Sequence, residues 1–329
     1  MRLLRKDQLL AFDDVLLVPQ YSIVPSRSAP DLSITLAGYI PLQIPILPAN
    51  TDTITGVEML KAVRDYGGWG YIHRSLSEEE RISLASQSLP LTIGACSEEV
   101  SIAEKLLRAG CRDFCVDIAH ADSVHGLMMV ERLYNWSIIL NEKITICAGN
   151  VCTVEGALRL VEAGAHIIKC GIGPGSICTT RKVTGHGYPQ LSAIIEVAAG
   201  LEGKASLIAD GGIRSSGDIV KALAAGADAV MVGRLLAGCE ETPGPVLPGT
   251  EGSGAYKVYR GMASEPARKD RDPHKSWGAP EGISCLVPYQ GPVQDVLSEL
   301  ADGVRSGLSY SGAHSIKDLQ ERATFAIVK

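Results

Sequence analysis

The chain has 329 residues, of which 46% are hydrophobic and 21% are charged, and its formal net charge is −6. This composition is ordinary for a soluble globular protein. The acidic balance argues against a nucleic-acid partner. The lack of a long apolar stretch argues against a membrane span or a signal peptide.

Residues 1–40 are expected to form an N-terminal arm, after which short apolar runs alternate with helical patterns. Eight strands are predicted, at residues 43–48, 68–73, 91–95, 113–118, 144–149, 166–171, 206–210 and 229–233. Helices are predicted between them, for example at residues 98–109, 153–163, 189–199 and 216–225. Eight β/α units favour an α/β fold of the (β/α)8 TIM-barrel type, which takes about 250 residues. The alternative is a doubly wound open sheet, but no Gly-x-Gly-x-x-Gly motif follows the first strand.

A recurring Ala-Gly pair supports a repeated unit. It precedes three predicted strands, at residues 109–110, 163–164 and 225–226. Glycine suits the left-handed residue that ends a helix. Because successive copies are two β/α units apart, the pattern is typical of a repeated architecture.

Residues 238–285 interrupt the alternation and are rich in Gly, Pro and polar side chains. A connection of this length in a compact domain is usually a lid, a binding loop or disordered. Since it follows the eighth predicted strand, we expect a mobile flap on the barrel face that carries active sites.

The nine cysteines indicate the cellular compartment in which the protein is expected to work. Their number is odd, and their spacings are not those of paired metal knuckles. Cys147 and Cys170 stand in apolar runs and are expected to be small core residues. A reducing, cytoplasmic location is therefore predicted.

The most informative segment is the loop at residues 171–181, Gly-Ile-Gly-Pro-Gly-Ser-Ile-Cys-Thr-Thr-Arg, which follows an apolar run. Its three glycines and one proline exclude the interior of a helix or strand. Cys178 has polar neighbours, so burial in an apolar core, the alternative, is disfavoured. A thiol on such a loop is placed like a nucleophile, and a nearby cation would favour the thiolate. Carbonyl groups of this turn could also surround a monovalent cation.

Glycine-rich turns follow the seventh and eighth predicted strands, as Asp-Gly-Gly-Ile at residues 210–213 and Gly-Arg at residues 233–234. In a TIM barrel such turns form the usual phosphate site, and the hydroxyl of Ser176 adds a donor. This predicts a phosphorylated ligand beside Cys178. The alternative is that these glycines only make tight turns.

Together these motifs resemble the IMP dehydrogenase / GMP reductase family over nearly the whole chain. The segments that carry the likeness are residues 171–190, 12–19, 210–213, 259–262 and 281–282. The resemblance implies a (β/α)8 barrel in a homotetramer and a purine 5′-monophosphate whose C2 atom is attacked by Cys178. It also implies a nicotinamide cofactor and a K⁺ ion held by carbonyl groups of Gly173, Gly175 and Cys178.

The resemblance also implies the other site residues. Thr180 and Glu281 match the acid–base pair of the family. Residues expected to bind or flank the substrate are Asn50, Asp52, Ser176, Asp210, Gly211, Gly212, Gly233, Arg234, Gly261 and Met262. Residues expected to line the cofactor side are Asp117, Ala119, Gly149 and Asn150.

Within the family, the flap favours a GMP reductase, which uses NADPH to convert GMP to IMP and ammonia. Dehydrogenases activate water with an Arg-Tyr pair, whereas residues 261–281 contain no tyrosine. The chain also has no room for the tandem regulatory domain that dehydrogenases usually carry, so a single catalytic domain over residues 1–329 is expected.

Other segments look like a dehydrogenase, namely residues 12–19, 233–238 and 305–307. The main alternative is therefore an IMP dehydrogenase without the regulatory domain, with Arg271 or His274 as the base for water. A divergent member acting on another purine monophosphate is also open. A non-catalytic nucleotide-binding homologue is disfavoured because Cys178, Thr180 and Glu281 are all present.

Overall fold

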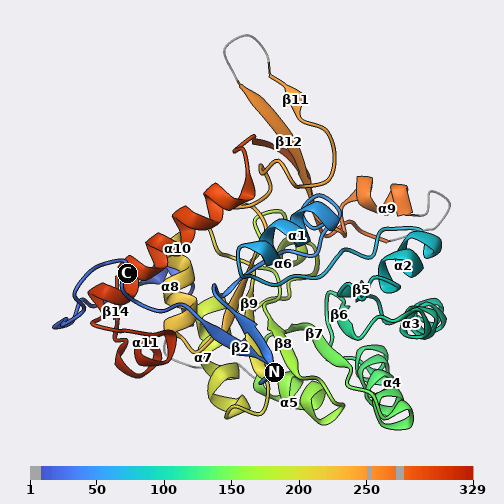
Figure 1. Ribbon diagram of the computed structural model, residues 1–329, viewed down its shortest axis with the longest axis horizontal. Helices are drawn as coiled ribbons and strands as arrows, with labels where there is room; N and C mark the ends of the chain where they lie inside the picture. Colours follow the sequence, from blue (N-terminus) through green and yellow to red (C-terminus); the bar gives the residue numbers. More distant parts are fainter. Residues whose placement is uncertain (1–8, 250–253, 272–277, 329) are drawn as a thin grey trace.

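A computed structural model of the chain describes residues 9–249, 254–271 and 278–328 (Figure 1). At its centre lies a curled sheet of seven parallel strands, with neighbours in the order β4, β10, β9, β8, β7, β6, β5. The strands are β4 (Ile46–Pro48), β5 (Leu91–Ile93), β6 (Asp113–Asp117), β7 (Thr145–Val151), β8 (Ile167–Cys170), β9 (Ser206–Asp210) and β10 (Ala229–Val232). The expected TIM-barrel-like α/β fold is thus confirmed.

The strand expected at residues 68–73 is reduced to a single parallel bridge between Ile72 and Leu91 of β5. On its other side the segment packs tightly on β4, since a Cβ atom at Gly68 would lie 2.9 Å from the carbonyl oxygen of Ile46. Pro48 of β4 has no backbone N–H group and so cannot donate a hydrogen bond to a strand in this segment. The segment therefore lies between β5 and β4 without forming an eighth regular strand.

Helices cover the outer face of the curled sheet, and the predicted ones are present as α3, α5, α7 and α8. The helices are α1 (Val57–Asp65), α2 (Glu78–Ala85), α3 (Ser97–Ala109), α4 (Val124–Leu140), α5 (Val154–Glu162), α6 (Thr180–Thr184), α7 (Gln190–Leu201), α8 (Ser216–Ala224), α10 (Val293–Tyr310) and α11 (Ile316–Arg322). Gly110, Gly164 and Gly226 have φ angles of 119°, 111° and 106°. The repeated Ala-Gly pair thus ends helices in the left-handed conformation, as predicted.

The described part of the N-terminal arm is tied to the barrel. After the short helix η1 (Phe12–Asp14), β1 (Val15–Leu17) pairs antiparallel with β14 (Phe325–Ile327). A hairpin of β2 (Ile34–Leu36) and β3 (Ile40–Leu42) buries the side chains of Leu36, Ile40 and Leu42 inside the barrel.

The hairpin closes the amino-terminal end of the barrel. The amide of Ala37 donates to the hydroxyl of Ser206 at 2.9 Å, and the Tyr39 hydroxyl donates to that of Thr145 at 2.9 Å. Both acceptors are the first residues of their strands. A buried layer above the hairpin includes Cys147, as expected of a core residue. The carboxyl ends of the strands are left for a site.

The region expected as a flap contains regular structure in its described part. β12 (Ala255–Arg260) pairs antiparallel with β11 (Leu247–Pro248) and with β13 (Ser284–Pro288). The helix α9 (Glu265–Arg271) follows β12. Figure 1 shows β11 and β12 extending away from the barrel. The mobility of the flap stays a prediction.

None of the helices in the described segments combines the length and the apolar character needed to cross a membrane.

Candidate active site

A cavity of about 410 Å³ lies at the carboxyl ends of the barrel strands. Loops after the strands form its floor and walls, and the flap contributes side chains from β12, α9 and the segment before β13. The expected site residues that line it are Asn50, Asp117, Ala119, Asn150, Gly173, Gly175, Cys178, Thr180, Asp210, Gly211, Gly233, Gly261, Met262 and Glu281.

Three of these residues form a series of hydrogen bonds. The Cys178 thiol donates to the hydroxyl oxygen of Thr180 at 3.2 Å. That hydroxyl donates to Oε2 of Glu281 at 2.9 Å. The thiol is half-buried, as a nucleophile in a cavity must be to meet its substrate. A proton can therefore move between the sulfur and the carboxylate through one hydroxyl group.

Backbone pairing brings the cysteine loop and the flap together. The amide of Thr179 donates to the carbonyl oxygen of Glu281 at 3.0 Å, and the amide of Ile283 donates to that of Ile177 at 3.0 Å. The amide of Glu281 in turn donates to the carbonyl oxygen of Ala263 at 3.1 Å. The Glu281 side chain is thus positioned by hydrogen bonds on both sides of its backbone.

The floor of the cavity contains a buried lysine that the sequence analysis did not select. Lys169 of β8 is 1% exposed, and its ammonium donates to Oδ1 of Asp117 at 2.5 Å and to Oδ2 of Asp210 at 3.1 Å. The side-chain amide of Asn150 also donates to Oδ2 of Asp210, at 2.8 Å. The signal in the sequence was a single charge within an otherwise apolar run.

The charges in this cluster stabilise one another. Burial opposes ionisation of Lys169, but the carboxylates of Asp117 and Asp210 outweigh it and hold the pKa of the lysine well above its usual value. Burial likewise opposes the Asp117 carboxylate, but Lys169 holds the pKa of Asp117 below its usual value. Lys169 and Asp117 are therefore both charged near neutral pH.

Tyr259 is a further cavity residue that lay within a quoted motif but was not selected. Its side chain is 5% exposed, and burial raises its pKa to about 12 despite a hydrogen bond with Ser176. The hydroxyl lies close to Gly233, where a Cβ atom would be 2.5 Å away. A neutral hydroxyl is thus placed beside the glycine-rich turn that was predicted to bind phosphate.

Five expected residues do not line this cavity: Asp52, Gly149, Ser176, Gly212 and Arg234. Asp52 pairs with Arg260, whose Nη2 lies 2.7 Å from Oδ2. Gly149 is buried against β8, where a Cβ atom would lie 2.5 Å from that of Lys169. Ser176 and Gly212 line a neighbouring cavity of about 310 Å³ beneath η1, and Arg234 is exposed.

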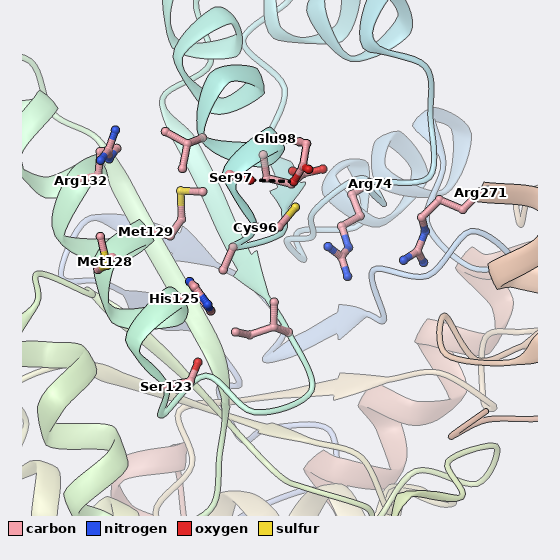
Figure 2. A pocket seen from close by; sticks show the side chains of 14 residues that line it. Arg74, Cys96, Ser97, Glu98, Ser123, His125, Met128, Met129, Arg132 and Arg271 are labelled. Atoms are coloured by element: carbon pink, nitrogen blue, oxygen red, sulfur yellow. Dashed lines mark hydrogen bonds between the residues drawn. The ribbon is translucent and has the colours of Figure 1, made fainter. Parts of the chain in front are cut away.

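A second, larger groove of about 1130 Å³ adjoins the first cavity and shares Arg74, Ile118 and Arg271 with it. Figure 2 shows Arg132 of α4 at the opposite end of this groove from Arg74 and Arg271. Met129, His125 and Cys96 lie between the guanidinium groups in this view, and Glu98 and Glu99 also line the groove. The arginine side chains at its two ends are suited to contact anionic groups of a ligand.

The described residues contain no cluster of three or more His, Cys, Asp or Glu side chains that could hold a metal ion. All nine cysteines are free thiols. His274, named as an alternative base, lies outside the described residues.

A barrel with a thiol, a hydroxyl and a carboxylate in series at the carboxyl ends of its strands has the arrangement of an enzyme with a cysteine nucleophile. Comparison with known proteins specifies the class further. Residues 9–329 match the IMP dehydrogenase / GMP reductase domain, so the chain belongs to this family of nicotinamide-dependent oxidoreductases.

Relatives from both branches are similar to this chain. An inosine-5′-monophosphate dehydrogenase from Aquifex aeolicus is 48% identical over 242 residues, which cover 71% of this chain and 48% of that protein. The chain thus spans about half the length of that relative. GMP reductase 2 from Bos taurus is 39% identical over 334 residues, which cover 97% of this chain and 94% of that protein.

Among solved structures, a GMP reductase variant from Trypanosoma brucei in complex with guanosine 5′-monophosphate is similar to this chain, with a TM-score of 0.90. The two sequences are 27% identical, and the likeness covers 98% of this chain and 96% of that one.

Proposed function

We propose that this protein is a GMP reductase, which uses NADPH to convert GMP to IMP and ammonia. The observation that carries the proposal is the hydrogen-bonded series from Cys178 through Thr180 to Glu281. Similarity to a GMP reductase with bound GMP supports a purine 5′-monophosphate as substrate. A homotetramer and a cytoplasmic location accompany the proposal as predictions from the sequence.

In the first half-reaction, the Cys178 thiol transfers its proton through Thr180 to Glu281, and the thiolate adds to C2 of the purine. A carbon–sulfur bond forms. Glu281 then returns the proton through Thr180 to the amino group on C2, the carbon–nitrogen bond breaks, and ammonia leaves. This use of one group as base and then acid needs a short path for the proton, which the distances of 3.2 Å and 2.9 Å support.

In the second half-reaction the reduced nicotinamide supplies a hydride to C2 when it is bound. The carbon–sulfur bond breaks, Cys178 leaves as the thiolate, and it regains a proton from solvent through Thr180 and Glu281. Asp117, Ala119 and Asn150 line the side of the cavity that continues past Ile118 into the larger groove. We therefore assign this side to the cofactor.

The larger groove would hold the rest of the dinucleotide. Because it shares Arg74 and Arg271 with the first cavity, these guanidinium groups suit the phosphates that link its two halves. Arg132, at the far end, is suited to the additional phosphate of NADPH. This is the basis for proposing NADPH as the cofactor.

The proposed K⁺ ion is compatible with the cysteine loop. The carbonyl oxygen of Gly175 accepts a hydrogen bond from the Cys178 amide at 3.1 Å and keeps a second lone pair. Within the described residues, no backbone amide bonds to the carbonyl oxygens of Gly173 and Cys178. These three carbonyl groups would hold the ion and fix the loop.

The second candidate function is an IMP dehydrogenase without the regulatory domain. It is favoured by the 48% identity to the Aquifex aeolicus dehydrogenase and by the two arginines that α9 adds to the cavity, Arg268 and Arg271. Partial burial and the nearby guanidinium of Arg74 lower the pKa of Arg271, as a base for water would require. A divergent member that acts on another purine monophosphate would use the same cysteine.

The two reactions are distinguished by the direction of the change in nicotinamide absorbance. The purified protein is mixed with NADPH and GMP in one assay and with NAD⁺ and IMP in another. Oxidation of NADPH with release of ammonia is expected. Reduction of NAD⁺ with IMP, and no oxidation with GMP, would contradict the proposal. Cys178→Ala should abolish either activity and so confirm that the reaction belongs to this site.

A further inference from the structure

Two lysines are fully buried in the described part of the chain, and only one of them touches the active-site cavity. Lys257 of β12 is 2% exposed and donates to the carbonyl oxygens of Glu240 at 3.2 Å and Thr242 at 2.6 Å. Lys169 of β8 instead contacts two carboxylates that line the cavity. Burying an ammonium is costly unless its partners compensate, so these two partner sets reflect different roles.

The contacts of Lys169 connect opposite sides of the cavity floor. Asp117 is the last residue of β6 and Asp210 is the last residue of β9, so β8 with its lysine lies between them in the barrel. The ammonium and the amide of Asn150 both bond to Oδ2 of Asp210. Neither bond occupies Oδ1, which keeps its lone pairs for a ligand.

We propose that Lys169 is a positioning residue that holds Asp117 and Asp210 in place so that each accepts hydrogen bonds from a different ligand. Both carboxylates line the cavity, with Asp210 expected on the side of the purine nucleotide and Asp117 on the side of the cofactor. The assignment of the two ligands rests on the proposed function.

The physical reason lies in the charges of the cavity floor. Without an ammonium between them, two carboxylates at one end of a barrel disfavour each other's ionisation, and burial adds to this effect. A carboxylate that becomes protonated loses acceptor capacity, and one without its buried partner is free to rotate away from the ligand. Loss of Lys169 should therefore weaken the binding of both ligands, although neither ligand needs to touch the lysine.

The test uses Lys169→Met, a neutral side chain of similar length, with calorimetric titration of GMP and of IMP followed by steady-state kinetics. We expect dissociation constants and KM values for both nucleotide and cofactor to rise about 10- to 100-fold, the usual range when an orienting partner is removed. The acid limb of the pH profile of kcat/KM should move to higher pH by about one unit or more. Burial raises the pKa of Asp117, and without the ammonium of Lys169 only the guanidinium of Arg74 and the side-chain amide of Asn50 remain to lower it. Lys169→Arg should keep this limb near its original position.

Lys257→Met is the matched control because it also removes a buried ammonium, but one bonded to carbonyl groups outside the cavity. It should lower thermal stability without moving the acid limb of the pH profile. If Lys169→Met does not fold, the double variant Lys169→Met/Asp117→Asn removes the uncompensated charge. Its dissociation constant for the purine nucleotide should still exceed that of Asp117→Asn alone.

Unchanged dissociation constants and an unchanged acid limb in Lys169→Met would overturn the role of Lys169. Wild-type protein that binds neither GMP nor IMP would instead contradict the proposed function. A readout without ligand still tests the charge argument in that case. Lys169→Met should gain thermal stability as the pH falls from 8 toward 5, since protonation relieves the carboxylates, and the opposite trend would overturn it.

Discussion

The hydroxyl of Thr180 donates a hydrogen bond of 2.9 Å to Glu281, although 101 positions separate the two residues in the chain. Thr180 lies near the end of the cysteine loop, where α6 begins, and Glu281 lies in the flap shortly before β13. One backbone hydrogen bond from Thr179 to Glu281 and another from Ile283 to Ile177 hold the two segments together. The flap therefore contributes Glu281 to the hydrogen-bonded series as well as side chains to the cavity wall.

We expect Glu281→Gln to lower kcat about 100- to 10,000-fold, the range for loss of a general acid–base group. Glutamine can still accept the hydrogen bond of Thr180 but cannot take up its proton. The KM for GMP should change only a few-fold because the shape of the cavity is kept. Steady-state oxidation of NADPH measures both values.

Thr180→Ser keeps the hydroxyl and serves as the control, whereas Thr180→Val removes it and should approach the kcat of Glu281→Gln. If Glu281→Gln retained a kcat within a few-fold of the wild type, the proton path through Thr180 would be wrong.

The sequence predicted the parts of this site that are local in the chain. Cys178 and Thr180 stand two positions apart in one glycine-rich loop, and the loop follows an apolar strand. Glu281 was selected only through the resemblance to a family, because composition and spacing carry no information about a pairing across 101 positions.

Two residues of this region take part in long-range ion pairs that could not be predicted from the sequence. Asp52 was expected to bind or flank the substrate, and no feature of the sequence indicated its ion pair with Arg260, 208 positions away. Lys169 was not selected because a charged residue in an apolar run has no evident partner until β9 and β6 are placed on opposite sides of β8 in the barrel. The missing eighth strand has a different cause, since Gly68 and Gly70 pack closely on β4 without a regular strand pairing.

We expect Arg132→Ala to raise the KM for NADPH about tenfold or more, as for loss of a hydrogen bond to a charged group, while the KM for NADH stays nearly constant. Arg132 lies at the far end of the larger groove, and within the described residues it has no ion-pair partner. Initial rates with both cofactors measure the ratio.

Arg108→Ala is the matched control, since this exposed arginine pairs with Glu104 and does not line the groove. It should leave both KM values unchanged. An equal rise in the KM for NADPH and NADH in Arg132→Ala would argue against recognition of the additional phosphate.

A second buried ion pair predicts how stability depends on pH. Arg81 and Glu99 form two hydrogen bonds of 3.0 Å and 2.9 Å. Burial raises the pKa of Glu99, but Arg81 outweighs it and holds the pKa below its usual value. A lowered folded-state pKa adds stability above the unfolded pKa that is lost as the pH falls below it. The unfolding temperature of the wild type should therefore decrease as the pH falls below about 4.5. Glu99→Gln should make this decrease smaller.

Arg81→Met should lower the free energy of unfolding by about 3–5 kcal/mol at neutral pH, because it leaves Glu99 buried without its partner. The control is Lys105→Met, which breaks the exposed pair with Glu78 and should cost about 1 kcal/mol or less. Similar losses in the two variants, measured by chemical denaturation, would show that burial does not govern the Arg81 pair.

The entrance of the cysteine loop predicts a large difference between two glycines four positions apart. Gly171 has a φ angle of 147°, and a Cβ atom there would lie 2.0 Å from the carbonyl oxygen of Asp210. At Gly175 the nearest atom would be Cβ of Cys178 at 3.4 Å, and φ lies outside the left-handed region. Gly171→Ala should therefore lower the free energy of unfolding by at least about 2 kcal/mol, from strain and overlap. Gly175→Ala should change it by only about 0.5 kcal/mol, as at an unconstrained position. Equal stabilities in urea denaturation would mean that β9 can move away from β8 without cost, and that the loop does not depend on their close approach.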